Sequence, residues 1–259
     1  MSERGRERSK GSGRPAPVET FHPLPDGTQW LELGSCESTQ DALWSAPEGV
    51  SLVSARAQRQ GRGRRGRQWL SPAGGLYLSW RPQLPFGPAD GVCLPFLAAS
   101  ALAELLEAQL DLRVQLKWPN DLLVAGAKLA GILVEGRSVG PRWSALVGIG
   151  LNAESLGLPP EATSLAALGH PVDPNTLIFP LYEHLQRLLR EVSAAPSPLP
   201  AALKRWRSFE FPLGTEILRE GSLGRYQGVN DEGALIFAGE NEQRLISSGE
   251  VTLISHDQL

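Results

Sequence analysis

Three short strand-like segments follow one another between residues 114 and 135, with very little chain between them. They are separated by the turn sequences Pro119–Asp121 and Ala125–Lys128. Turns this short join strands that are antiparallel neighbours, because a parallel crossover needs a dozen or more residues. The segments are Val114–Trp118, Leu122–Ala125 and Leu129–Glu135, with a fourth, Ser144–Asn152, close behind. We therefore expect an antiparallel or mixed sheet.

Two longer segments have the spacing of amphipathic helices. Apolar residues recur every three or four positions in Gly91–Leu110 and again in Asn175–Ala194. Short helices are expected from Ser38 to about Ser45, with a hydroxyl capping the first turn, and over Ala201–Phe209 after a proline-rich kink. Further strands are expected at Thr28–Leu33, Val50–Gln58 and Gly75–Arg81. The pattern predicts an α+β fold in which a mixed or antiparallel sheet is flanked by helices.

The composition of the chain changes near both ends. Residues 1–18 are polar, without periodicity, and are expected to form a disordered arm. From about Phe211 the sequence turns to short strands with glycine turns, which predicts a small β-barrel of roughly 50 residues. The expected organisation is an arm (1–18), an α+β body (19–210) and a β domain (211–259).

Composition also excludes several classes of protein. The 259 residues are 41% hydrophobic and 20% charged with a net charge of -3, which argues against a wholly disordered chain and against a surface built for nucleic acid. The longest candidate for a membrane span, Val92–Leu106, contains Pro95 and Glu104 and is shorter than the roughly 20 residues required. Residues 1–14 lack the apolar stretch of a secretory signal, so we expect a cytoplasmic protein. Two cysteines and four scattered histidines predict neither a disulfide framework nor a zinc site.

The segment Arg56–Arg67 holds six arginines and three glycines. It contains a formal Gly-x-Gly-x-x-Gly match, but the dinucleotide fingerprint requires a helix next and here another strand follows. Three interpretations stay open: a solvated loop, a loop that orders over a bound anion, and an Arg-Gly arm that binds single-stranded RNA. Because glycines are costly to order and arginines repel one another, we expect the loop to be open until an anion binds.

The hairpin motif Lys117-Trp-Pro-Asn-Asp121 precedes a second lysine, Lys128. Pro-Asn-Asp alone is a good turn, since proline fixes φ and the Asn and Asp side chains bond to nearby backbone. The alternative is that two ammonium groups, an amide and a carboxylate together hold a carboxylate, a phosphate and a Mg²⁺ ion.

Five motifs occur in an order that resembles biotin protein ligases. The resemblance spans about residues 30–209, and the last β segment is similar to the family's SH3-like domain. The third motif residue is Gln40 where the family usually has Asn, and no helix-turn-helix precedes the body, as in ligases without a DNA-binding domain. The motifs are Ser38-Thr39-Gln40, Gly61–Ser79 (GRGRRGRQWLSPAGGLYLS), Lys117–Leu123 (KWPNDLL), Lys128–Glu135 (KLAGILVE) and Val147–Asn152 (VGIGLN).

The resemblance implies an ATP-dependent ligase that joins biotin to a lysine of a biotin carboxyl carrier protein, such as the acetyl-CoA carboxylase subunit. The implied intermediate is biotinyl-5′-AMP, formed with Mg²⁺ and with release of pyrophosphate. The resemblance implies no DNA or membrane partner and leaves a homodimer open.

The resemblance also implies roles for individual residues. Lys128 and Asp121 are the implied catalytic residues, and Asn120 and Asp121 are candidates for metal binding. Biotin contacts are implied for Ser38, Thr39, Gln40, Gln58, Arg62, Gly63, Arg64 and Lys128, and contacts to ATP or the adenylate for Arg67, Trp69, Asn120, Asp121 and Asn152.

Other interpretations compete with this one. A lipoate or octanoate ligase has the same adenylate chemistry but lacks the combination of GRGRRGR and KWPND. A binding module without catalysis and an RNA-binding protein acting through Arg59–Arg67 are the two non-enzyme alternatives. Plain turn, cap or core-packing roles also remain open for Ser38, Thr39, Trp69 and Asn152 taken singly.

Overall fold

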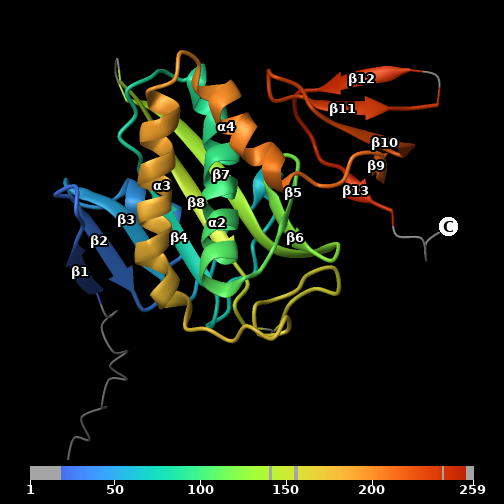
Figure 1. The fold of residues 1–259 in the computed structure, drawn as a ribbon. Coiled ribbons are helices and arrows are strands. Elements are labelled where there is room, and N and C mark those ends of the chain that lie inside the picture. Colours follow the sequence, from blue (N-terminus) through green and yellow to red (C-terminus); the bar gives the residue numbers. More distant parts are fainter. Residues whose placement is uncertain (1–18, 140–141, 155–156, 241, 255–259) are drawn as a thin grey trace, which may run out of the picture.

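A computed structural model describes residues 19–139, 142–154, 157–240 and 242–254 (Figure 1). Its main element is an eight-stranded sheet with the order β1-β2-β3-β4-β8-β7-β6-β5. Strands β2 and β3 run parallel and the other neighbouring pairs run antiparallel, so the predicted mixed sheet is confirmed. The strands are β1 Glu19–Pro23, β2 Gln29–Leu33, β3 Val50–Ala55, β4 Leu76–Trp80, β5 Gln115–Lys117, β6 Asp121–Val124, β7 Ala127–Val139 and β8 Arg142–Leu151.

The edge strand β1 was not predicted from the sequence. Its residues, Glu-Thr-Phe-His-Pro, are mostly exposed and do not alternate in polarity. The strand forms because its backbone pairs with β2, where His22 lies opposite Trp30 and the two rings stack with centroids 4.2 Å apart. The predicted arm, residues 1–18, lies outside the described residues.

Helices cover one face of the sheet (Figure 1). The largest helix, α2, contributes a nearly continuous row of buried residues that pack with Trp80, Leu116 and Trp118 of the sheet and its loops. The predicted helices are confirmed, but α4 begins inside the stretch predicted as a kink, because a proline is well tolerated in the first turn of a helix. The helices on this face are α2 Leu94–Leu110, α3 Ile178–Ser193 and α4 Pro198–Trp206, with short 3₁₀ turns η2 Asp90–Cys93, η3 Pro174–Leu177 and η4 Arg207–Phe209.

The short helix α1, Thr39–Trp44, packs on the opposite face. Its Leu43 joins a second apolar cluster with Leu31 and Val53 of the sheet. The helix lies where the sequence predicted it, but the cap prediction was wrong: Ser38 makes no side-chain hydrogen bond to the first turn.

The segment Asp90–Leu110 is long and apolar enough, by length and composition, to cross a membrane. The prediction that no segment reaches this length was therefore wrong, because η2 continues directly into α2. Of the 18-residue apolar stretch within this segment, 72% is buried inside the protein, where α2 packs against α3, α4 and the sheet. Core packing accounts for its apolar composition.

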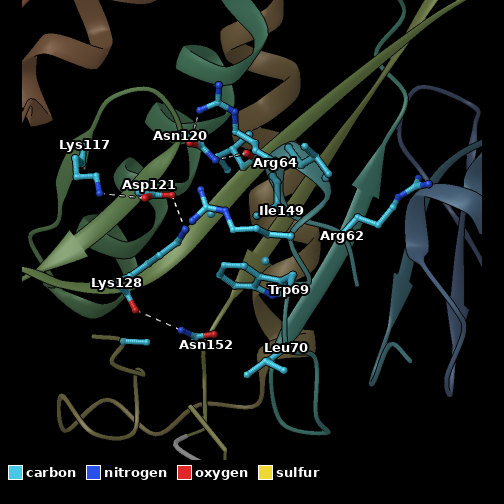
Figure 2. Close-up of a pocket in the computed structure, with 18 of the residues that line it drawn as sticks. Arg62, Arg64, Trp69, Leu70, Lys117, Asn120, Asp121, Lys128, Ile149 and Asn152 are labelled. Carbon is cyan, nitrogen blue, oxygen red and sulfur yellow. Dashed lines mark hydrogen bonds and ion pairs between the residues drawn. The ribbon is translucent and has the colours of Figure 1, made fainter. Parts of the chain in front are cut away.

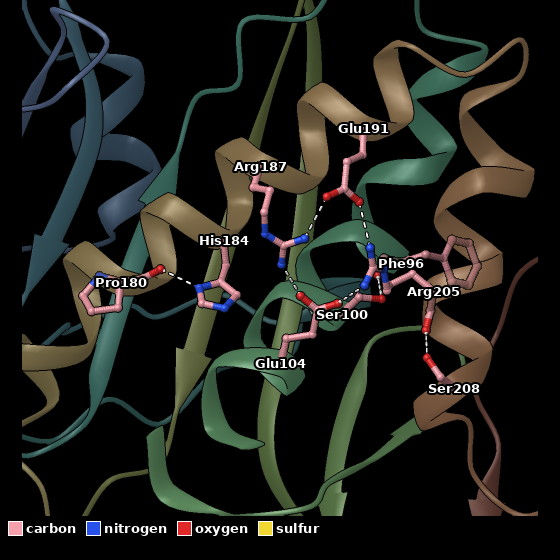
Figure 3. Close-up of polar contacts among 9 residues, drawn as sticks. All are labelled: Phe96, Ser100, Glu104, Pro180, His184, Arg187, Glu191, Arg205 and Ser208. Carbon is pink, nitrogen blue, oxygen red and sulfur yellow. Dashed lines mark hydrogen bonds and ion pairs between the residues drawn. The ribbon is translucent and has the colours of Figure 1, made fainter. Parts of the chain in front are cut away.

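Four side chains tie the helical layer together in a closed ring of ion pairs (Figure 3). Glu104 of α2 bonds to Arg187 of α3 and lies 3.0 Å from Arg205 of α4. Glu191 of α3 lies 2.8 Å from each of the same two arginines. The ring fixes α4, and through it the start of the C-terminal segment, to the rest of the layer.

The C-terminal segment forms a separate five-stranded antiparallel sheet with the order β12-β11-β10-β9-β13, which fits the predicted SH3-like domain. Among the described hydrogen bonds between this segment and the body, Phe211 N donates to Leu116 O at 2.9 Å and Trp118 Nε1 donates to Gly233 O at 3.0 Å. The strands are β9 Glu216–Arg219, β10 Ser222–Val229, β11 Leu235–Ala238, β12 Gln243–Ile246 and β13 Thr252–Leu253.

Candidate functional site

A pocket of about 660 Å³ lies over one end of strands β6, β7 and β8. The arginine-rich loop covers one side of it, and Glu250–Leu253, from the C-terminal sheet and the turn before it, form part of its wall. Every site residue predicted from the sequence lines this pocket: Ser38, Thr39, Gln40, Gln58, Arg62, Gly63, Arg64, Arg67, Trp69, Asn120, Asp121, Lys128 and Asn152.

Neutral hydrogen-bonding groups line the end of the pocket near α1. The Oε1 atom of Gln58 accepts from Thr39 N at 2.8 Å and from Thr39 Oγ1 at 3.1 Å. Its Nε2 donates to Ser71 Oγ at 2.9 Å, and Ser79 Oγ donates to Thr39 Oγ1 at 2.8 Å. These bonds fix the orientation of the Gln58 amide, so this end can select a neutral polar ligand group by its donors and acceptors.

Two lysines share one carboxylate at the other end of the pocket (Figure 2). Lys128 Nζ lies 2.6 Å from Asp121 Oδ1, and Lys117 Nζ lies 3.4 Å from Asp121 Oδ2. Burial lowers the pKa of Lys117 from its usual value, and the nearby ammonium of Lys128 acts in the same direction, whereas Asp121 opposes the shift. With both lysines protonated, the cluster carries a net positive charge and favours an anionic ligand.

Asn120 connects this hairpin to the arginine loop. Its Nδ2 donates to Ile132 O at 2.8 Å, and its Oδ1 accepts from Arg64 Nη1 at 3.2 Å. The amide therefore holds Arg64 over the pocket.

Contacts within the protein hold the arginine loop over the pocket, and the dependence of loop closure on a bound anion stays a prediction. Arg62 pairs with Asp41 at 3.0 Å and with Glu135 at 2.9 Å. Arg64 also donates to Gly249 O at 3.2 Å, and Arg67 pairs with Glu250. The sequence analysis considered repulsion among the arginines but not the carboxylates that neutralise them, which come from distant parts of the chain.

Trp69 lies on a part of the sheet that has no side chains. Gly131 of β7 and Gly150 of β8 are direct partners in register, and a Cβ atom built on Gly150 would lie 2.5 Å from the Trp69 indole. Lys128 Nζ lies 5.3 Å from the ring centroid. Trp69 thus forms part of the pocket wall beside Lys128 (Figure 2), rather than packing into the main apolar core.

Asn152 lines the pocket, but its amide is used within the protein. Its side chain is only 5% exposed, and Nδ2 donates to Thr163 O at 3.1 Å and to Lys128 O at 3.4 Å. This residue positions the strand that carries Lys128, an additional role to the adenosine contact implied by the resemblance.

Several pocket residues were not singled out from the sequence. The glycines on β7 and β8 could have been predicted from the sequence. Gly148 and Gly150 are two positions apart on one strand, so both lie on the same face of the sheet and neither carries a side chain there. The Leu158–Ala162 segment and Glu250–Leu253 had no local signal. Their position in the pocket depends on backbone pairing between segments that are far apart in the sequence, such as the bridge between Lys128 and Ala162.

The described residues contain no group of three or more His, Cys, Asp or Glu side chains placed to hold a metal ion. The two candidates fit a protein-held Mg²⁺ poorly, because Asp121 already faces two lysines and the Asn120 oxygen faces Arg64. A Mg²⁺ ion that is held mainly by substrate phosphates needs fewer protein ligands.

Comparison with known proteins identifies the family. A model of the Biotin/lipoate A/B protein ligase family matches residues 34–152. The chain is 37% identical over 242 residues to a biotin–(acetyl-CoA-carboxylase) ligase of Paracoccus denitrificans, covering 85% of this chain and 98% of that one. It is 30% identical over 273 residues to the bifunctional ligase/repressor BirA of Escherichia coli K12, covering 96% and 83%.

The fold gives the same result. The biotin protein ligase of Aquifex aeolicus, solved in complex with biotin and ATP, matches with a TM-score of 0.72 and 29% identity, covering 87% of this chain and 98% of that one. The similarity therefore extends over the main sheet, the helices and the C-terminal sheet. The resemblance predicted from the sequence motifs is confirmed, and the chain belongs to the biotin protein ligase family.

Proposed function

We propose that this enzyme uses ATP to attach biotin to a lysine of a biotin carboxyl carrier protein, by way of biotinyl-5′-AMP. The observation that carries the proposal is the polarity of the pocket. One end presents neutral donors and acceptors around Gln58, and the other presents Lys128 and Lys117 around Asp121. A ligand with a neutral polar ring and an anionic tail, such as biotin, fits this arrangement.

The first step brings two anions together. The biotin carboxylate must approach the α-phosphate of ATP, and repulsion between two unit charges 4 Å apart amounts to about 4 kcal/mol at an effective dielectric constant of 20. Lys128 is placed to lower this repulsion, since its ammonium lies inside the pocket next to Asp121. The carboxylate oxygen then forms a bond to phosphorus and pyrophosphate leaves, which produces the mixed anhydride.

The second step is attack of a carrier lysine on the anhydride carbonyl, with AMP as the leaving group. A free lysine amine has a pKa near 10.4, so the carrier amine must lose its proton before it attacks. Asp121 is the carboxylate nearest to the proposed reaction centre, and we assign it the role of holding Lys128 and orienting the incoming amine. Arg64 and Arg67 cover the adenylate until the carrier arrives.

Three further assignments belong to the same proposal. Mg²⁺ accompanies ATP and is held by its phosphates, in keeping with the poor fit of Asn120 and Asp121 to a protein-held ion. The carrier is a biotin carboxyl carrier protein of a carboxylase such as acetyl-CoA carboxylase, which is the substrate named for the Paracoccus relative. The reaction takes place in the cytoplasm.

The test is biotin-dependent exchange of pyrophosphate into ATP with Mg²⁺ and without carrier, followed by transfer of labelled biotin to a carrier domain. We expect exchange without carrier and a label on one carrier lysine, lost when that lysine is replaced by arginine. The absence of biotin-dependent exchange contradicts the proposal. Exchange with lipoate or octanoate but not biotin favours the alternative ligase, and RNA binding without any exchange favours a non-enzyme.

A further inference from the structure

Gln40 connects three parts of the pocket through one amide. It lies in the first turn of α1 and is 3% exposed. Its Nε2 donates to Leu133 O of β7 at 2.9 Å, and its Oε1 accepts from Arg62 Nη2 of the arginine loop at 3.4 Å. The side chain therefore reaches from the helix to the sheet and to the loop at once.

Gly148 provides the space that this amide occupies. Gly148 of β8 is the register partner of Leu133, the residue whose carbonyl accepts from Gln40. A Cβ atom built on Gly148 would lie 2.6 Å from Gln40 Nε2, closer than non-bonded atoms approach. The amide of Gln40 thus occupies the space that a side chain at position 148 would fill, so the long side chain of Gln40 requires a glycine at position 148.

Arg62 is held between α1 and β7 by groups that surround Gln40. Asp41, the next residue of α1, accepts from one terminal nitrogen at 3.0 Å. Glu135, two residues beyond Leu133 on β7, accepts from the other at 2.9 Å. The planar guanidinium fork thus pairs with α1 through Asp41 and with β7 through Glu135, and it also donates to the Gln40 amide, which bridges the same two elements.

We propose that Gln40 is a positioning residue that latches Arg62, and with it the arginine loop, over the neutral end of the pocket, and that Gly148 is the residue that makes room for this latch. The contacts that form the latch all lie within the protein. The value of the latch for catalysis rests on the proposed function: a loop already ordered at this end spares biotin the cost of ordering it.

Loop opening can be measured without any activity assay, because trypsin cleaves after arginine and the loop contains Arg59, Arg62, Arg64, Arg65 and Arg67. Gln40→Met keeps the side-chain length but removes both hydrogen bonds, and Gln40→Asn keeps the amide but shortens it. Loss of one hydrogen bond to a charged group should raise the open fraction, and with it the cleavage rate, about tenfold. Gln227→Met, the same change at an exposed glutamine of β10, is the matched control and should leave the rate unchanged.

A double-mutant cycle tests the pairing with Gly148. Gly148→Ala alone should open the loop about as much as Gln40→Asn, because the new methyl group displaces the amide. In the Gln40→Asn background the alanine has nothing to displace, so the double variant should be no more open than the worse single variant. Thermal unfolding of each variant separates loop opening from global destabilisation.

Kinetics then separates positioning from chemistry. In pyrophosphate exchange, Gln40→Asn should raise the KM for biotin about tenfold, with kcat within about twofold of the original enzyme. Three results would overturn the proposal that Gln40 latches Arg62. They are trypsin cleavage rates in the Gln40 variants equal to that of the Gln227→Met control, additive effects of the two substitutions in the double-mutant cycle, and a fall in kcat at constant KM. If the chain proves not to use biotin, the trypsin and double-mutant results still decide whether the latch exists.

Discussion

Gly131 and Gly150 lie opposite each other on β7 and β8, and the indole of Trp69 rests on both. A Cβ at 150 would approach the indole to 2.5 Å, whereas one at 131 would stop at 3.1 Å. We therefore expect a graded effect in which Gly150→Ala displaces Trp69 and Gly131→Ala shifts it only slightly. Overpacking of this kind costs about 1–3 kcal/mol, so the Kd for ATP should rise about 5- to 150-fold in Gly150→Ala. Isothermal titration of both variants checks the order; equal Kd values would contradict this role for the glycine pair.

Lys128→Ala should abolish adenylate formation and leave the fold intact. The ammonium next to Asp121 is the cation we place at the reacting carboxylate, and loss of one such group typically costs 10²–10³-fold in rate. Pyrophosphate exchange measures the loss, and circular dichroism confirms folding. Lys204→Ala, at an exposed lysine of α4, is the control. Exchange in Lys128→Ala at the level of this control would remove Lys128 from the mechanism.

Arg64→Gly should release adenylate from the enzyme. Arg64 is held over the pocket by Asn120 Oδ1 and Gly249 O, and glycine makes neither contact. We expect pyrophosphate exchange to survive while bystander proteins become biotinylated, which mass spectrometry of their lysines will detect. Arg65→Gly is a close control, because Arg65 is exposed and already has a positive φ of 55°, which glycine adopts easily. Labelling confined to the carrier lysine in Arg64→Gly would show that Arg64 does not retain the intermediate.

The junction between the two sheets should respond to pH through Glu210. Burial raises the pKa of this carboxyl group from its usual value of 4.5, although Tyr226 and Arg207 act in the opposite direction. A raised pKa means that the folded state holds the proton more tightly than the unfolded state. The contribution of protonated Glu210 to the free energy of unfolding is complete below pH 4.5. It is lost as the pH rises through the pKa that Glu210 has in the folded protein.

Glu210→Gln removes this titration. The urea midpoint of the original protein should fall relative to that of Glu210→Gln as the pH rises from 4 to 7. A difference between the two midpoints that stays constant over this range would contradict the assignment.

The ring of ion pairs in the helical layer offers a comparison between two glutamates that bind the same two arginines (Figure 3). The side chain of Glu104 is 14% exposed and that of Glu191 is 45% exposed. Glu104→Ala should lower the free energy of unfolding by about 1–3 kcal/mol, because it removes the more buried carboxylate and leaves each arginine with only the more exposed Glu191. Glu191→Ala should cost less than about 1 kcal/mol. Urea denaturation of both variants measures the two losses of unfolding free energy. Equal losses would mean that the burial of each glutamate does not determine its contribution to stability.

The features that local sequence determines could be predicted. The hairpin at Pro119–Asp121 was predicted from turn chemistry and short strand-like runs, and α3 from an apolar face that repeats with the helical period. The site residues implied by the family motifs lie at the start of α1, in the arginine loop, in the β5–β6 hairpin, on β7 and just after β8, and all of them line one pocket.

The remaining features depend on contacts between distant segments. Strand β1 pairs with the open edge of β2; Thr20 and Phe21 are residue types common in strands, but the five residues are mostly exposed and show no alternation of polarity. The closure of the arginine loop depends on Asp41, Glu135 and Glu250, which single-segment reasoning does not connect to Arg62 or Arg67. Ser38 occupies the N-cap position of α1, but its side chain makes no capping hydrogen bond and the residue lines the pocket.

The pocket wall formed by Glu250–Leu253 has a consequence for protein synthesis. Ser38, at one end of the pocket, leaves the ribosome long before Leu253, although both line the same cavity. The main sheet can form while the nascent chain is still attached, since earlier segments generally fold first. The wall is complete only after the last strand of the small sheet has been translated and has paired with β9. Nascent chains, and messages that end prematurely before β13, therefore yield a main sheet whose pocket stays open on one side.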